Sequence, residues 1–145
     1  MKVFLSLVAA ALIATGCSTA PPRITTNEPS PTSAPETILD TWEFTTTGKD
    51  GIRKSAFKLT DTPADTCISG EWFKAKVISA GELKPSDPAY TYSNGRLELL
   101  ITNGLCDAYT SFVGTVSGAQ FDGTYVSYGL FGGTEHGKVV GFRRR

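Results

Sequence analysis

Few side chains in this chain of 145 residues could do covalent or metal chemistry. The chain has three cysteines, Cys17, Cys67 and Cys106, and one histidine, His136. A catalytic Ser-His-Asp or Cys-His arrangement would have to use that histidine, and a metal site would need further ligands beside it. Because His136 lies in the glycine-rich stretch 132–137, we expect a mobile turn there, which would hold a general base poorly. The sequence therefore predicts a protein that is not an enzyme and that carries no cofactor and no metal.

Carboxylates are the remaining candidates for catalysis. Asp61, Asp65, Glu71 and Asp107 could supply the pair that glycoside hydrolysis needs, but the sequence fixes no separation between any two of them. Gly132-Gly133 does not form a phosphate-binding motif, because no Lys-Ser/Thr pair follows it at the required spacing. The carboxylates therefore define no catalytic site.

Cys17 stands between an apolar run and a proline-rich stretch. Lys2 precedes the run, Val3–Ile13, which is shorter than the about 20 apolar residues of a membrane-spanning helix. The run has the length and flanks of a secretory signal. The small residues Ala14-Thr15-Gly16 follow directly before Cys17, and they resemble the lipobox of bacterial lipoproteins. Ala14 departs from that pattern, in which Leu is more frequent at the first position.

The lipobox resemblance implies how the chain is processed and where it is located. Residues 1–16 would be a lipoprotein signal peptide, and Cys17 would become the first residue, with a diacylglyceryl thioether and an acyl chain such as palmitate on its amine. In such lipoproteins a residue other than Asp after the cysteine, here Ser18, favours the outer membrane of a Gram-negative cell. We therefore expect a lipid anchor in the bacterial outer membrane, on its periplasmic face. An ordinary signal peptide cleaved near Ala20 is the alternative.

Residues 17–37 are expected to be a tether. Thr19–Glu36 contains five of the eight prolines, with Ser and Thr and almost no apolar side chains. Such a composition cannot bury enough apolar surface to offset the entropy of ordering the chain. Residues 38–145 are long enough for one compact domain, which the tether would hold clear of the lipid headgroups.

The charge of the chain argues against one class of partner. Its 14 basic and 14 acidic side chains balance, so no electrostatic argument favours nucleic acid. Arg143-Arg144-Arg145 is the one basic cluster in the sequence. We interpret it as a solvated tail after the last strand, and the alternative is binding of anionic lipid or polysaccharide.

The pattern after residue 38 is that of antiparallel strands. Apolar side chains such as Leu97, Leu99 and Ile101 alternate with other residues, and no segment keeps the helical period over three turns. Asn94-Gly95 is a strong signal for a two-residue hairpin turn, since both residues tolerate positive φ. Eight strands are predicted, near 39–47, 51–60, 71–79, 89–93, 96–102, 107–117, 120–128 and 137–143.

Eight consecutive short strands predict an all-β fold, a small up-and-down antiparallel barrel that leaves no exposed edge. Trp42 in the first strand and Gly123-Thr124-Tyr125 resemble the calycin group of lipocalins, avidins and bacterial barrel-shaped protease inhibitors. That resemblance implies the barrel and carries over no ligand residue. Gly-Thr pairs recur at Gly114, Gly123 and Gly133, about one per strand or turn. Aromatic side chains are expected to point inward and fill the barrel, namely Trp42, Phe44, Phe57, Phe73, Phe112, Phe121, Tyr125 and Phe142.

Cys67 and Cys106 are expected to form a disulfide. With Cys17 lipidated, two cysteines remain, and export favours their oxidation. The bond would close a loop of about 40 residues and stabilise the fold by about 4 kcal/mol by chain-entropy arithmetic. A catalytic thiol and a metal pair are the alternatives.

Binding is the favoured class of function. We expect a protein-binding module, such as an inhibitor, an immunity factor or an accessory of envelope assembly. A carrier of a small apolar ligand inside the barrel is the first alternative, and a structural envelope lipoprotein without a ligand is the second. Barrels of eight strands either fill with side chains or hold one small ligand, and an apolar cavity of about 300 Å³ or more would favour the carrier.

A partner-facing surface is predicted in Ser127–Gly137, which is expected to be a loop between the last two strands. Apolar side chains displayed on a loop are typical of interaction hot spots. In the alternative interpretation Leu130 and Phe131 fold inward and plug the end of the barrel. The candidate partner-binding residues are Tyr128, Leu130, Phe131, Glu135 and His136.

Overall fold

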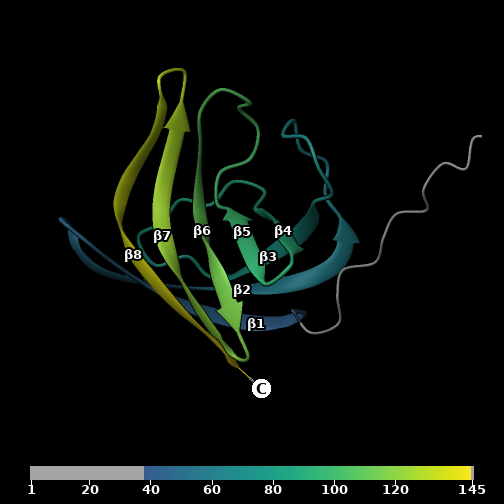
Figure 1. The fold of residues 1–145 in the computed structure, drawn as a ribbon, viewed down its shortest axis with the longest axis vertical. Coiled ribbons are helices and arrows are strands. Elements are labelled where there is room, and N and C mark those ends of the chain that lie inside the picture. The colour runs from purple at the N-terminus through teal and green to yellow at the C-terminus, as the bar shows by residue number, and fades with distance from the viewer. Residues whose placement is uncertain (1–37, 145) are drawn as a thin grey trace, which may run out of the picture.

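The computed structural model describes residues 38–144. The predicted signal peptide, Cys17, the tether and Arg145 lie outside the described residues. Eight strands form one closed antiparallel barrel, in which each strand pairs with the next and the last pairs with the first (Figure 1). The strands are β1 (Asp40–Gly48), β2 (Gly51–Pro63), β3 (Phe73–Ser79), β4 (Ala89–Ser93), β5 (Arg96–Leu100), β6 (Tyr109–Ser117), β7 (Gln120–Gly129) and β8 (Gly132–Arg144). The predicted all-β barrel of eight strands is confirmed. Within the described residues there is no helix with the length and apolar character needed to cross a membrane.

The strands end close to the predicted turn residues. Between β4 and β5, Asn94 and Gly95 have φ of 52° and 79°, as the predicted two-residue turn requires, and Ser93 pairs with Arg96 across it. Two strand ends differ from the prediction by more than two residues, the end of β2 and the start of β8. The longer β8 changes the interpretation of the candidate surface, as described below.

Aromatic rings pack against one another inside the barrel. The centroid of the Phe44 ring lies 5.4 Å from that of Phe112, 5.5 Å from that of Phe121 and 6.2 Å from that of Phe57. Tilted and edge contacts at such separations are favourable beyond the area they bury. The predicted inward positions are confirmed for Trp42, Phe44, Phe57, Phe73, Phe112 and Phe121, and Tyr125 is partly buried against the same core.

Phe142 is the exception, because its side chain is 55% exposed on the outer face of β8. Gly141 takes the adjacent inward position and is buried. A Cβ on Gly141 would lie 2.7 Å from the Phe44 ring, so Phe44 already fills the space that a β8 side chain would need. The prediction that Phe142 points inward is wrong, because alternation shows which residues share a face and not which face is buried.

Two of the recurring Gly-Thr pairs bring glycines of neighbouring strands side by side. Gly114 on β6 pairs with Gly123 on β7, and a Cβ on either would lie 2.7 Å from the ring carbon Cζ of Phe121. The absence of side chains at both positions leaves room for that ring. These glycines therefore serve the packing of the core.

Ile38 and Trp42 lie at the end of the barrel where β1 begins. Both are fully buried, and the Trp42 indole Nε1–H donates a hydrogen bond of 3.0 Å to the Ile38 carbonyl. The guanidinium carbon of Arg143 lies 6.0 Å from the centroid of the Trp42 ring, at cation–π distance. The residues around the start of the first strand are thus part of the core of the barrel.

Cys67 and Cys106 are placed as the predicted disulfide, with Cα atoms 5.5 Å apart, which is a usual separation for such a bond. The bond joins the segment between β2 and β3 to the segment between β5 and β6. Trp72, Ala89 and Leu100 form a second buried cluster, against which Ile68 packs from the first of these segments. The disulfide therefore fastens a segment that also contributes apolar contacts.

Candidate interaction surface on the β7–β8 hairpin

Ser127–Gly137 forms a hairpin of two paired strands, and the prediction of a loop there is wrong. β7 continues to Gly129 and β8 begins at Gly132, and these two residues pair with each other. Leu130 and Phe131 alone form the turn. Gly132 follows them with φ of 109°, a conformation that a residue with a side chain rarely adopts.

His136 is an extra residue in β8 that interrupts the pairing with β7. Tyr125 pairs with Gly137 and Val126 pairs with Glu135, so His136 has no opposite residue and forms a β-bulge. This bulge shifts the alternation of side chains by one residue. Because of this shift and the glycines around it, the sequence of this strand does not show alternating apolar residues.

The turn of this hairpin projects beyond the closed part of the barrel (Figure 1). Pairing between β1 and β8 ends at Gly48 opposite Gly137, so the part of β8 that precedes Gly137 extends past β1. Leu130 is 81% exposed and Phe131 is 105% exposed. The alternative that these two side chains plug the barrel is therefore wrong, because the turn holds them away from its interior.

One edge of the hairpin has no partner strand among the described residues. Gly132–Glu135 pairs with β7 on one side, and on the other side β1 has already ended. The backbone groups along such an edge can accept another strand, which is how many domains bind extended peptides. The edge lies directly beside the exposed turn.

Tyr128 lies on the outer face of the hairpin and is half-buried. Its ring stacks on that of Tyr109 with centroids 4.8 Å apart, and it covers Gly133 on the facing strand. Burial raises the pKa of both phenols above the ordinary value, and the carboxylate of Glu98 adds to the increase. The ring therefore braces the hairpin from the side of β6.

His136 lies on the inner face of the hairpin. Its Nε2 and the Ser127 hydroxyl share a hydrogen bond of 2.6 Å, and its ring lies 5.3 Å from that of Tyr125 between centroids. These contacts give the imidazole partners on β7. A hydroxyl bonded to an imidazole is half of a nucleophile–base arrangement. Within residues 38–144 no carboxylate bonds to the other ring nitrogen, so the arrangement lacks the third group that orients a base.

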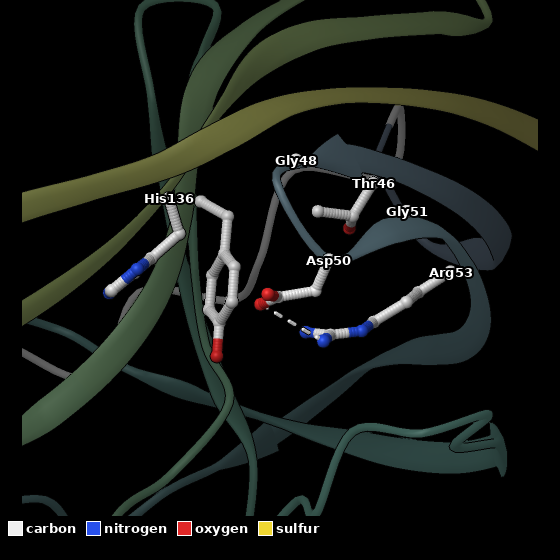
Figure 2. A pocket seen from close by; sticks show the side chains of 7 residues that line it. Thr46, Gly48, Asp50, Gly51, Arg53 and His136 are labelled. Atoms are coloured by element: carbon white, nitrogen blue, oxygen red, sulfur yellow. Dashed lines mark hydrogen bonds and ion pairs between the residues drawn. The ribbon is translucent and has the colours of Figure 1, made fainter.

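A hollow of about 240 Å³ lies beside His136, between this hairpin and the turn of the β1–β2 hairpin. Asp50 and Arg53 face one another across one side of it with an ion pair of 3.3 Å, and His136 lies on the opposite side (Figure 2). Arg53 also pairs with Glu82 at 3.0 Å. The charged groups on this side of the hollow are therefore already engaged in ion pairs. Across residues 38–144, no cluster of three or more His, Cys, Asp or Glu side chains could hold a metal ion.

The structure does not bring all five candidate residues together. Leu130 and Phe131 lie together at the turn, and Tyr128 lies below them on the outer face. Glu135 is exposed on β8, whereas His136 belongs to the inner face with Ser127. Sequence reasoning missed Ser127 and Tyr125 as partners of His136, because only the bulge brings them together.

Comparison with protein-family models, with curated proteins and with solved structures finds no match to this chain. The arrangement of the described residues therefore carries the argument about function.

Proposed function

We propose that this chain is an envelope lipoprotein whose barrel binds a protein partner through the turn of the β7–β8 hairpin. The observation that carries the binding part is the exposure of Leu130 and Phe131 on a turn that projects from the barrel. Large apolar side chains at the centre of an interface contribute most of its binding energy. The lipid anchor at Cys17 belongs to the same proposal and is supported by the sequence alone.

The hairpin is suited to hold these side chains in one orientation. Tyr128 stacks on Tyr109 on its outer face, and His136 bonds to Ser127 on its inner face. A braced hairpin loses less conformational entropy on binding than a mobile loop, which leaves more of the contact energy as affinity. The free edge of Gly132–Glu135 offers backbone hydrogen bonds to a strand of the partner beside the two apolar side chains.

The packed interior favours a protein partner over a small ligand carried inside. Phe44 contacts three other aromatic rings across the barrel, and the hollow of about 240 Å³ at its mouth is lined in part by Asp50 and Arg53. A carrier of apolar ligands needs an enclosed apolar space for its ligand. The carrier remains a distinct outcome of the experiment below.

The test places a photoactivatable amino acid at Leu130 in the full chain and irradiates cells that make it. We expect crosslinks to one protein, identified by mass spectrometry, and no crosslinks to it when the amino acid replaces Ile52. Ile52 is a matched control position, because it is 70% exposed beside the turn of the β1–β2 hairpin. Phe131→Ala is then added to the chain with the photoactivatable amino acid at position 130 and to the chain with it at position 52.

Phe131→Ala should weaken the crosslink at residue 130 by about 30-fold, since hot-spot truncations cost 2 kcal/mol or more. The melting temperature should stay unchanged, because the Phe131 side chain contacts solvent in the free protein. Equal crosslinking from positions 130 and 52, or capture that survives Phe131→Ala, would overturn the proposed surface. Co-purification of a small apolar molecule in place of a protein would support the carrier.

A further inference from the structure

A second surface, on the outer face of β8, β1, β2 and β3, carries an excess of basic side chains. Arg144, Thr41, Lys58 and Lys76 form one row across the four strands, because each pairs with the next. Parallel to it, Lys54 pairs with Thr45 and Lys138 pairs with Thr47. We call the residues Lys54, Lys58, Lys76, Lys138 and Arg144 the basic face. Since the whole chain has no net charge, five cations on one face are a segregation of charge.

The basic face is only partly neutralised by acidic neighbours. Glu43, which lies opposite Phe142 and Ala56 on this face, pairs with Arg144 at 2.6 Å, and Asp122 on β7 lies in the row of Val140, Thr45 and Lys54. The four lysines have no salt bridge among the described residues, and Lys58 lies directly opposite Lys76. Like charges directly opposite one another on a sheet are destabilising. A fold that keeps such a pair loses stability unless an anion binds there.

One large apolar side chain is exposed among these cations. Phe142 is 55% exposed between Arg144 and Lys138 on β8, and it borders a hollow of about 340 Å³ on this face. Lys54, Glu43 and the buried Ala56 also line that hollow. Basic side chains around exposed apolar ones are typical of surfaces that lie against anionic lipid headgroups.

The position of this face favours a membrane as the occupant. β1 begins at Asp40, next to Thr41 in the row of Arg144 and Lys58, so the preceding chain joins the barrel at the edge of the basic face. We propose that the basic face binds anionic lipid headgroups of a membrane surface. This orientation rests on the proposed attachment at Cys17, whereas the positions of the basic and apolar side chains do not depend on that attachment. Arg143 and Arg144 lie within β8, so the interpretation of these two residues as a tail after the last strand is wrong.

The test uses residues 17–145 with Cys17→Ser, so that no lipid anchor contributes. This shorter chain keeps all eight strands and the packed core that the structure describes in residues 38–144. The chain is sedimented with vesicles of phosphatidylcholine alone or mixed with phosphatidylglycerol. We expect binding to the mixed vesicles only, and loss of binding as salt shortens the Debye length from about 10 Å at 0.1 M to about 3 Å at 1 M.

Lys58→Gln with Lys76→Gln should weaken binding to the mixed vesicles about 30-fold, since each lysine near an anionic surface contributes about 1 kcal/mol. The control is Arg96→Gln, which removes a positive charge on β5, a strand that pairs with β4 and β6 and not with the strands of the basic face, and which should change binding little. The melting temperature of the Lys58/Lys76 variant should stay equal or rise.

Equal losses in the two variants, or no binding of the parent chain to mixed vesicles, would overturn the proposal. Binding to a soluble anionic polysaccharide, with the same lysine dependence but without vesicle binding, would assign the face to that polymer. Because the tested chain has no acyl group and an intact Phe131, failure here leaves the proposed lipid anchor and hairpin surface unaffected.

Discussion

Gly141 is a residue at which one added carbon should disturb the core. Its Cβ would lie 2.7 Å from the Phe44 ring and 3.1 Å from Cβ of Phe121. Overpacking of this kind typically costs about 1–3 kcal/mol. We expect Gly141→Ala to lower the free energy of unfolding by that amount, measured by denaturant titration. Gly129→Ala is the control, because its Cβ would have only a carbonyl oxygen 4.0 Å away; equal effects of both would contradict this account of β8.

Tyr90 should make stability depend on pH in the alkaline range. Its hydroxyl donates a hydrogen bond of 2.7 Å to the Thr60 carbonyl, and burial, with a smaller effect of Asp61, raises its pKa well above the ordinary 10.0. The folded protein therefore keeps a proton that the unfolded chain releases. This contribution to stability is fully present below pH 10 and decreases as the pH rises above it.

The measurement for Tyr90 is the melting temperature as a function of pH, together with the ultraviolet absorbance of the ionising phenols. We expect one phenol of the folded protein to ionise far later than the others and the melting temperature to fall in the same range. Tyr90→Phe should remove the late phenol and flatten the decrease. A variant that keeps the full alkaline decrease would assign the effect to other groups.

The sequence predicted which residue types form the core better than it predicted which face of each strand points inward. Six of the expected inward aromatics are buried in the core of the barrel. Phe142 could not be placed, since Gly141 supplies no volume and the space beside it is filled from β1 by Phe44. Which face of β8 is buried depends on the neighbouring strand, and no local pattern contains that information.

Elements with strong turn signals were predicted well. The Asn94-Gly95 turn fixed the pairing of β4 with β5, because both residues have positive φ. The β7–β8 hairpin was taken for a loop, since a bulge at His136 breaks the alternation and the glycines around it leave no pattern. The candidate side chains Leu130 and Phe131 were identified from their type, but only the three-dimensional pairing shows that they project.

The disulfide should contribute much of the stability of the β2–β3 and β5–β6 segments. The bond between Cys67 and Cys106 closes 39 residues of sequence, and the chain-entropy model assigns about 4 kcal/mol to a loop of this size. We expect no free thiol at these positions before reduction and a melting temperature lower by at least several degrees after it. The cysteine pair replaced by alanines should melt at the same lower temperature with or without reductant. Two alkylatable thiols in protein isolated from an oxidising envelope would contradict the bond.

The two proposed surfaces lie at different places along β8. Its first residues carry the exposed turn, whereas Arg144 at its other end belongs to the row of basic side chains beside the start of β1 (Figure 1). If the basic face rests on a membrane, the hairpin turn is held at the far end of β8. A chain attached upstream of β1 would therefore present Leu130 and Phe131 to a partner and not to the lipid.

The attachment itself is tested at Cys17, which lies outside the described residues. We expect cells that make the full chain to incorporate labelled palmitate into it and to retain it in the membrane fraction. Cys17→Ala should abolish the label and release the chain or block its processing, because the thioether that precedes cleavage needs the thiol. The control replaces Cys67 and Cys106 with alanine, which removes the other two cysteines and should leave the label unchanged. Labelled palmitate in the Cys17→Ala chain at the level of the parent would overturn the lipoprotein proposal. Any membrane binding of the chain would then depend on the basic face alone.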